Sequence, residues 1–193
     1  MADLTALHEQ IKKCRLCRLC ELGATQAVPG DGNFNAQVMF IGEAPGRDED
    51  KMGKPFVGAA GKFLNTMLEA IGLKREDVFI TNIVKHRPPE NRDPLPDEIE
   101  ACWPYLEEQI KIIKPKLIVT LGRHAMGKFL PGLKISVVHG QAKRVKGLWA
   151  EKQVYMPMYH PASALYNPGL RETLIHDMKK IPILLKKISD VTS

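Results

Sequence analysis

Three of the four cysteines in this chain, Cys14, Cys17 and Cys20, are spaced two residues apart, and the fourth, Cys102, lies far along the sequence. Neighbouring cysteines at this spacing converge on one centre more readily than they reach the geometry of a disulfide. Thiolates are soft ligands, and a C-x2-C-x2-C run with a remote Cys-x-Pro is more typical of ferredoxin-type ligation than of a zinc ribbon. The cysteines therefore favour an iron-sulfur cluster. Zinc, which uses the same ligands, is the alternative.

The composition limits the kind of protein that could carry such a site. A chain of 193 residues with 44% hydrophobic content suits one domain, residues 1–193, with a full core. It has no run of about 20 apolar residues that could span a bilayer, and its first ten residues form an acidic helical pattern instead of a signal peptide. We therefore expect no membrane association and a reducing, cytoplasmic compartment. The net charge of +6 favours a polyanionic partner without identifying one.

Apolar runs typical of β-strands alternate with helical patterns along the chain. This alternation predicts parallel strands, because each helical crossover returns the chain to the same edge of the sheet. The expected fold is a three-layer α/β/α sandwich around a central, mainly parallel, four-stranded sheet. We expect strands at 38–41, 78–84, 117–121 and 154–158, and helices at 60–71, 96–113, 123–130 and 170–187.

Polar segments that contain glycine, asparagine or histidine follow each of the four predicted strands. In an open parallel sheet the carboxyl ends of the strands form the ligand crevice, so these segments should gather at one edge as an active site. Residues 87–96, rich in proline and arginine, are long and irregular enough to form a working loop there. Each segment alone also has a simple structural explanation, such as a tight turn or a core histidine. The segments are Gly42 to Gly46, Asn82 with residues 86–89, Gly122 to His124, and His160 with Pro161.

Three stretches together resemble one family. They read IGEAPGRDEDKMGKPFVGAAG (41–61), TNIVKHRPPENRDPLP (81–96) and YHPASAL (159–165). In this combination they resemble the family 4 uracil-DNA glycosylases, the iron-sulfur branch of the uracil-DNA glycosylase superfamily. The resemblance implies an enzyme that flips uracil out of DNA, hydrolyses its N-glycosidic bond and leaves an abasic site. It also implies that the protein holds a 4Fe-4S cluster and acts as a monomer. The implied partner is uracil-containing DNA, single- or double-stranded, and a sliding clamp stays open as a further partner.

The resemblance assigns roles in binding the base. Phe56 matches the aromatic residue that stacks on the extruded base, and Asn82 matches the amide that pairs with the uracil edge. His160 matches the histidine aimed at O2, where a neutral imidazole can stabilise the departing uracilate by donating a hydrogen bond. Gly42 and Ala44 would offer backbone contacts to the base.

Glu43 is the only carboxylate in the Gly42 to Gly46 segment. By family position it either orients the attacking water or forms a wall beside C5 of uracil that excludes the methyl group of thymine. We favour a catalytic contribution. The loop and the start of the third helix would contact DNA phosphates through Arg87, Arg92 and Arg123.

The cluster ligands implied by the resemblance are Cys14, Cys17, His86 and Cys102. Most family members carry a Lys-Cys-Arg-Pro-Pro string, and this chain has histidine in place of that cysteine. Cys20, favoured by local spacing, therefore competes with His86, favoured by family position. Histidine can ligate iron-sulfur centres, and we choose His86 because Cys20 falls where relatives often have a residue that is not a ligand. A structural role for the cluster is favoured over a redox role, because glycosidic hydrolysis needs no electron transfer.

Two further positions depart from the family pattern. Ala164 stands where a leucine that wedges into the base stack is frequent, so the wedge is undetermined. Ala59 stands where an arginine is common after Phe-Val-Gly, and one backbone contact is expected to be lost.

Three other functions stay open. The Lys-His pair also resembles covalently trapping UdgX-type relatives, but Asn91 is near the aligned position of their reactive histidine, so ordinary turnover is favoured. A non-catalytic iron-sulfur or zinc protein that binds nucleic acid is opposed by the intact Phe56, Asn82 and His160. A phosphate-handling enzyme is opposed by the missing P-loop lysine and by the acidic run at 48–50.

Overall fold

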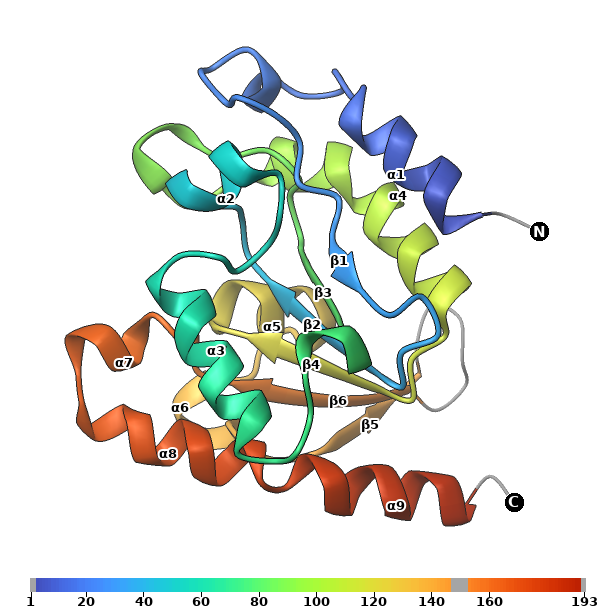
Figure 1. Ribbon diagram of the computed structural model, residues 1–193, viewed down its shortest axis with the longest axis vertical. Helices are drawn as coiled ribbons and strands as arrows, with labels where there is room; N and C mark the ends of the chain where they lie inside the picture. Colours follow the sequence, from blue (N-terminus) through green and yellow to red (C-terminus); the bar gives the residue numbers. More distant parts are fainter. Residues whose placement is uncertain (1–2, 147–152, 192–193) are drawn as a thin grey trace.

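A six-stranded sheet runs through the middle of the computed structural model, which describes residues 3–146 and 153–191 (Figure 1). Its strand order is β1-β3-β2-β4-β6-β5. Four strands are parallel and correspond to the predicted ones: β2 (Val38–Gly42), β3 (Phe79–Asn82), β4 (Leu117–Leu121) and β6 (Gln153–Met158). The mainly parallel sheet is confirmed.

The predicted number of four strands is wrong, because an antiparallel edge strand lies on each side of the parallel ones. These are β1 (Asp31–Gly32) next to β3 and β5 (Lys143–Val145) next to β6. The two strands are two and three residues long. So few residues carry no readable alternation of apolar and polar side chains, because that pattern needs four or more positions.

Helices cover both faces of the sheet, which gives the three layers (Figure 1). On one face α1 (Leu4–Lys12), α4 (Pro96–Ile113) and α5 (Arg123–Phe129) share a core with Met39 and Ile41 of β2. On the other face α3 (Ala59–Glu69), α8 (Gly169–Met178) and α9 (Ile181–Val191) pack with Val38 and Phe40. Alternate side chains of one strand thus enter different cores, as the pleat requires.

Short helices complete the chain. They are α2 (Arg47–Met52), α6 (Ile135–Val138) and α7 (Ser163–Tyr166), with 3-10 turns at Arg18–Cys20, Arg75–Asp77 and Pro89–Asn91. Within the described ranges, no helix combines the length and apolar character needed to cross a bilayer.

The predicted helices at 60–71, 96–113 and 123–130 are confirmed to within two residues at each end. The single helix predicted at 170–187 is wrong, because the chain forms two helices, α8 and α9, separated at Lys179 and Lys180. Pro182 accounts for the break. It has no N–H to donate to the carbonyl of Met178, and its ring would crowd that carbonyl in a continuous helix.

A buried lysine joins three parts of the chain beneath the carboxyl edge of the sheet. Lys85 is 1% exposed, and its Nζ donates to Thr81 Oγ1 and the Asn82 carbonyl at 2.7 Å and to Gln109 Oε1 at 2.8 Å. Thr81 Oγ1 and Gln109 Nε2 donate in turn to the carbonyl of Pro29, at 2.9 and 2.7 Å. The network ties the N-terminal segment and α4 to β3, and burial lowers the pKa of Lys85 to about 8.

We expect Gln109→Leu to lower the free energy of unfolding by about 2 kcal/mol, because it removes one acceptor from a buried ammonium group. Glu108→Gln, at the neighbouring and more exposed position of α4, should change it by less than about 0.5 kcal/mol. Urea unfolding of both variants, at equal iron content, measures the difference. Equal stability of the two would show that the Lys85 network does not support the fold.

Candidate active site

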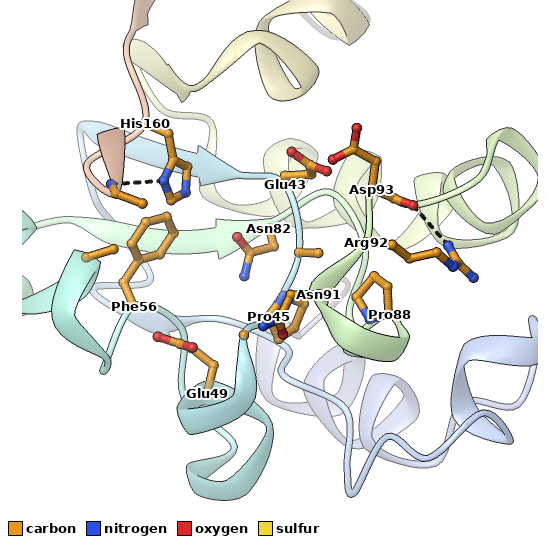
Figure 2. Close-up of a pocket in the computed structure, with 14 residues that line it drawn as sticks. Glu43, Pro45, Glu49, Phe56, Asn82, Pro88, Asn91, Arg92, Asp93 and His160 are labelled. Atoms are coloured by element: carbon orange, nitrogen blue, oxygen red, sulfur yellow. Dashed lines mark hydrogen bonds between the residues drawn. The ribbon is translucent and has the colours of Figure 1, made fainter. Parts of the chain in front are cut away.

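One pocket opens at the carboxyl edge of the parallel strands, where the sequence predicted it (Figure 2). Its volume is about 340 Å³. Five of the predicted catalytic and base-binding residues line it, together with Arg92 from the loop after β3. The lining residues are Glu43, Ala44, Pro45, Gly46, Glu49, Phe56, Ala60, Asn82, Pro88, Asn91, Arg92, Asp93, His160 and Ala162.

Asn82 ends β3 at the floor of this pocket. Its side chain is 2% exposed, and its Oδ1 is buried without a hydrogen-bond partner among the described residues. A buried acceptor left unpaired is costly, so Oδ1 is best explained as awaiting a donor from a ligand. Gly42 pairs with Asn82 in the sheet. A Cβ added at Gly42 would collide with Asn82 Oδ1 and would lie 2.7 Å from Cζ of the Phe56 ring. Glycine is therefore required behind the pocket.

Phe56 is held in a strained loop between α2 and α3. Its φ of 51° is left-handed, a conformation that costs an ordinary residue about 1 kcal/mol. Arg75 donates to the carbonyls of Pro55 and Phe56 at 2.7 and 3.0 Å. Glu49 accepts from the next two backbone N–H groups, of residues 57 and 58, at 2.9 Å each. A Cβ at Gly61 would overlap the Phe56 carbonyl. These contacts fix the direction of the Phe56 ring.

His160 follows β6 and packs its ring on that of Phe56, with ring centroids 5.5 Å apart and planes inclined by 28° (Figure 2). The backbone N–H of Ala162 donates to His160 Nδ1 at 3.2 Å. Nδ1 is therefore unprotonated, and the neutral ring carries its proton on Nε2. Burial lowers the pKa of His160 to about 4, against an opposing effect of Glu49. At neutral pH this histidine is an uncharged hydrogen-bond donor.

Glu43 lies on another wall of the pocket, close to Asp93 (Figure 2). Burial raises the pKa of Glu43 to about 7, repulsion by Asp93 and a hydrogen bond between the two side chains add to the rise, and Arg123 opposes it. The carboxylate is therefore poised to exchange a proton near neutral pH, the range that suits a general base.

The loop after β3 carries two of the predicted arginines. Arg92 pairs with Glu98, which has no exposed surface, at 2.7 and 2.9 Å. Arg87 donates through Nε to Asn91 Oδ1 at 2.8 Å. The third predicted arginine, Arg123 at the start of α5, is 72% exposed. Arg87 and Arg123 lie outside the pocket lining, and Arg92 is already bound by a buried carboxylate.

The segment after His160 shows which side chains face solvent near the pocket. Ala164 is 6% exposed and belongs to the core, so it is not a wedge. The next two residues, Leu165 and Tyr166, are 45% and 89% exposed. Ala59, the other departure from the family pattern, is exposed at the start of α3.

The cysteines lie away from the pocket, between the N-terminal segment and α4. Cys14 Sγ accepts from the Leu16 N–H at 3.4 Å, and Cys102 Sγ accepts from the Lys85 N–H at 3.2 Å. Burial raises the pKa of Cys102 to about 11, and the nearby thiols of Cys17 and Cys14 add to the rise. These three thiols therefore share one environment.

The two competing ligands differ in their contacts. Cys20 is buried, and its Sγ donates to the carbonyl of Cys17 at 3.0 Å. His86 is 6% exposed, and its ring makes no hydrogen bond within the part of the chain that the structure describes. Burial lowers the pKa of His86, and Arg15 of the cysteine segment lowers it further, so this segment lies close to the ring.

Sequence reasoning missed Asp93, Glu49 and Arg75, none of which had been given a role in the pocket. Glu49 and Arg75 contact the Phe56 loop across 8 to 20 positions of the chain, and Asp93 contacts Arg123 and His124 of α5. Carboxylates and arginines on a predicted surface have no periodicity that marks such contacts. Glu49 lies just after the Gly42 to Gly46 segment and Asp93 lies in the predicted loop, but Arg75 precedes β3 and carried no such signal.

Comparison with known proteins identifies the family of this chain. Residues 29–180 match the family described as the Uracil DNA glycosylase superfamily. The chain is 51% identical over 188 residues to the Type-4 uracil-DNA glycosylase of Sulfurisphaera tokodaii, covering 94% of this chain and 84% of that protein. It is 48% identical over 192 residues to the Type-4 uracil-DNA glycosylase of Archaeoglobus fulgidus, covering 95% and 96%. The resemblance of the sequence motifs is confirmed, and this chain belongs to the uracil DNA glycosylase superfamily.

Proposed function

We propose that this protein is a DNA repair glycosylase that removes uracil from DNA by hydrolysing its N-glycosidic bond, leaving an abasic site. The observation that carries the proposal is the unpaired, buried Oδ1 of Asn82 in a pocket shared with Phe56 and a neutral His160. Its relatives of nearly equal length are named Type-4 uracil-DNA glycosylases. Uracil in DNA is hidden by stacking, so the nucleotide must be flipped into this pocket.

The pocket supplies the groups that a flipped uracil needs. Asn82 Oδ1 accepts from N3–H, its amide nitrogen donates to O4, and Phe56 stacks on the ring. His160 donates from Nε2 to O2, where negative charge grows as the uracil anion leaves. A neutral donor in a desolvated pocket stabilises that charge without a full proton transfer.

On the sugar side, the bond breaks through an oxocarbenium-like centre that water must reach. Glu43 is the carboxylate in the pocket wall whose pKa, raised to about 7, suits acceptance of a proton from that water. The backbone at Gly42 and Ala44 lies beside the base, and the missing side chain of Gly42 keeps this side open.

The DNA strand would pass over the mouth of the pocket. We assign Arg87 and Arg123 to phosphate contacts, because their terminal nitrogens are not bound by a buried carboxylate. The guanidinium group of Arg92 is already paired with Glu98, so Arg92 would contact a phosphate only from the outer side of that ion pair. Leu165 and Tyr166, exposed on the short helix α7 that follows His160, would fill the gap that the flipped base leaves in the stack.

Cys14, Cys17, His86 and Cys102 would hold a 4Fe-4S cluster. Although all of them are described, no three of their ligand atoms lie within 4.8 Å of one another. A single tetrahedral zinc needs ligand sulfurs about 3.8 Å apart, since each Zn–S bond is about 2.3 Å, whereas a four-iron cluster needs a wider cage. When bound, the cluster would cross-link the N-terminal segment to α4, a structural role. The chain would act as one domain, 1–193, and as a monomer, in a reducing cytoplasm that preserves such a centre.

Incubated with an oligonucleotide that contains uracil, the protein should release free uracil over many turnovers. Water is the acceptor, because Asn91, which lines the pocket where a trapping histidine would lie, is no nucleophile at neutral pH. Chromatography of the released base and denaturing electrophoresis of the DNA measure both outcomes. A protein–DNA adduct would refute turnover, and the absence of both uracil and adduct would refute the proposed function.

His160→Ala should lower the single-turnover rate of uracil release about 10² to 10³-fold, the effect of losing one donor to a developing anion, with little change in DNA binding. His176→Ala, on the exposed side of α8, is the matched control and should leave the rate unchanged. Asn82→Ala should weaken inhibition by free uracil as well as the rate, because the uracil edge loses its partner. A His160→Ala rate within a few-fold of the original would remove this histidine from the chemistry.

His86→Ala should lose iron and visible absorption, whereas His86→Cys should keep both, because cysteine restores a ligand at that position. Cys20→Ser should also keep both, because its thiol already donates to the Cys17 carbonyl. Iron analysis of the purified variants decides between the two ligands. Loss of iron in Cys20→Ser with retention in His86→Ala would reverse the assignment.

A further inference from the structure

The contacts of Glu43 involve a second carboxylate, Asp93 in the loop after β3, to which the resemblance assigned no role. Asp93 lines the same pocket, and ligand atoms of Glu43, Asp93 and His124 lie within 4.8 Å of one another. A hydrogen bond between the two acidic side chains is among the causes that raise the pKa of Glu43. Two carboxylates can share a hydrogen bond only when one of them holds a proton, so a hydrogen-bonded pair carries a single negative charge.

We infer that Asp93 forms a proton-sharing pair with Glu43 and positions and tunes it as the base for the attacking water. The inference rests on the proposed function. As the water oxygen bonds to C1′ of the sugar, the electron pair of the C1′–N1 bond leaves with uracil. The water proton passes to the carboxylate pair, and the Nε2–H of His160 stabilises the uracil anion.

The loop that carries Asp93 is pinned in place. Arg92 Nη1 donates to the Asp93 carbonyl and to Glu98 Oε2, at 2.9 Å each, and Nη2 donates to Glu98 Oε1 at 2.7 Å. Leu95 N–H also donates to Glu98 Oε2 at 2.8 Å. The backbone on both sides of Asp93 is thus tied to a fully buried carboxylate on α4, so the Asp93 side chain is held towards Glu43.

Groups from α5 complete the surroundings. Arg123 lies 3.8 Å from Asp93 Oδ2, and His124 Nε2 lies 3.2 Å from the same oxygen and 4.0 Å from Glu43 Oε2. Arg123 Nε lies 2.9 Å from the same His124 Nε2. Arg123 is the fixed positive charge near the pair. The other titratable groups in the pocket lining are Glu49, Arg92 and His160.

The charges around Glu43 shift its pKa in opposite directions, so removing each of them tests the carboxylate pair. Asp93 raises the pKa of Glu43 and Arg123 lowers it. Because a base must be unprotonated, the rate should rise with pH through the pKa of Glu43, about 7. His160, with its pKa lowered to about 4, titrates well below this range. Glu43→Gln should lose the acidic limb of the pH–rate profile together with most of the activity.

The experiment measures single-turnover uracil release against pH, with enzyme in excess. Asp93→Asn should move the acidic limb down by about one pH unit, because a like charge is removed, and lower the plateau about 10-fold. Arg123→Gln should move the limb upward. Asp97→Asn, an exposed carboxylate on the first turn of α4, should not move it. A purely structural Asp93 would change the rate without moving the limb, and that result would overturn the inference.

Two further measurements distinguish a failure of this inference from a failure of the proposed function, and a carboxylate pair from a cation site. The pKa of Glu43, followed by carboxyl ¹³C NMR in the protein without DNA, should fall in Asp93→Asn. If it falls but the parent protein releases no uracil, the carboxylate pair stands and the proposed function fails. A chelator should leave the rate unchanged. Loss of activity with EDTA that Mn²⁺ restores would overturn the inference, because the three side chains would then be ligands of a cation.

Discussion

The ammonium group of Lys85 is buried beneath the pocket, and a buried charge is stable only when its hydrogen bonds are made. Its three acceptors belong to the side chains of Thr81 and Gln109 and to the carbonyl of Asn82. The backbone N–H of the same residue reaches Cys102. One residue therefore connects the end of β3, helix α4 and the cysteine region. The position of Asn82, on which the pocket depends, follows from this satisfied network.

The opposite wall of the pocket depends on contacts that hold an unfavourable backbone. Phe56 adopts a left-handed conformation between α2 and α3. Glu49 binds the N–H groups on one side of it and Arg75 binds the carbonyls on the other. Strain of this kind persists only where the surroundings determine the conformation more than once. The aromatic ring is thereby presented at a fixed distance from Gly42, which has no side chain to block it.

Burial shifts the pKa values of two titratable groups of the site, His160 and Glu43, in opposite directions. Burial lowers the pKa of His160 to about 4 and raises that of Glu43 to about 7, because in both cases it disfavours the charged form. The histidine becomes a neutral donor suited to an anionic leaving group. The glutamate becomes able to exchange a proton near neutral pH, as its proposed role requires. A single physical cause thus separates the proposed donor from the proposed base.

The sequence by itself determined the layers of the fold and most of the pocket. Apolar runs of four or more residues predicted the parallel strands, because burial on both faces leaves a continuous hydrophobic signal. Since parallel strands end at one edge, the segments after them had to meet, and Glu43, Phe56, Asn82 and His160 do line one pocket. Helix α4 matched its predicted bounds, because Pro96 starts it and its apolar period is regular.

The tertiary structure alone decided the features that depend on contacts between distant residues. The edge strands β1 and β5 form by pairing with β3 and β6, and their own residues carry no strand pattern. The proximity of Asp93 to Glu43 depends on Arg92 reaching Glu98, and the neutral state of His160 depends on burial and the Ala162 N–H. Residue type and spacing specify which groups are present. Their protonation and partners are set by desolvation and distance, which exist only once the chain has folded.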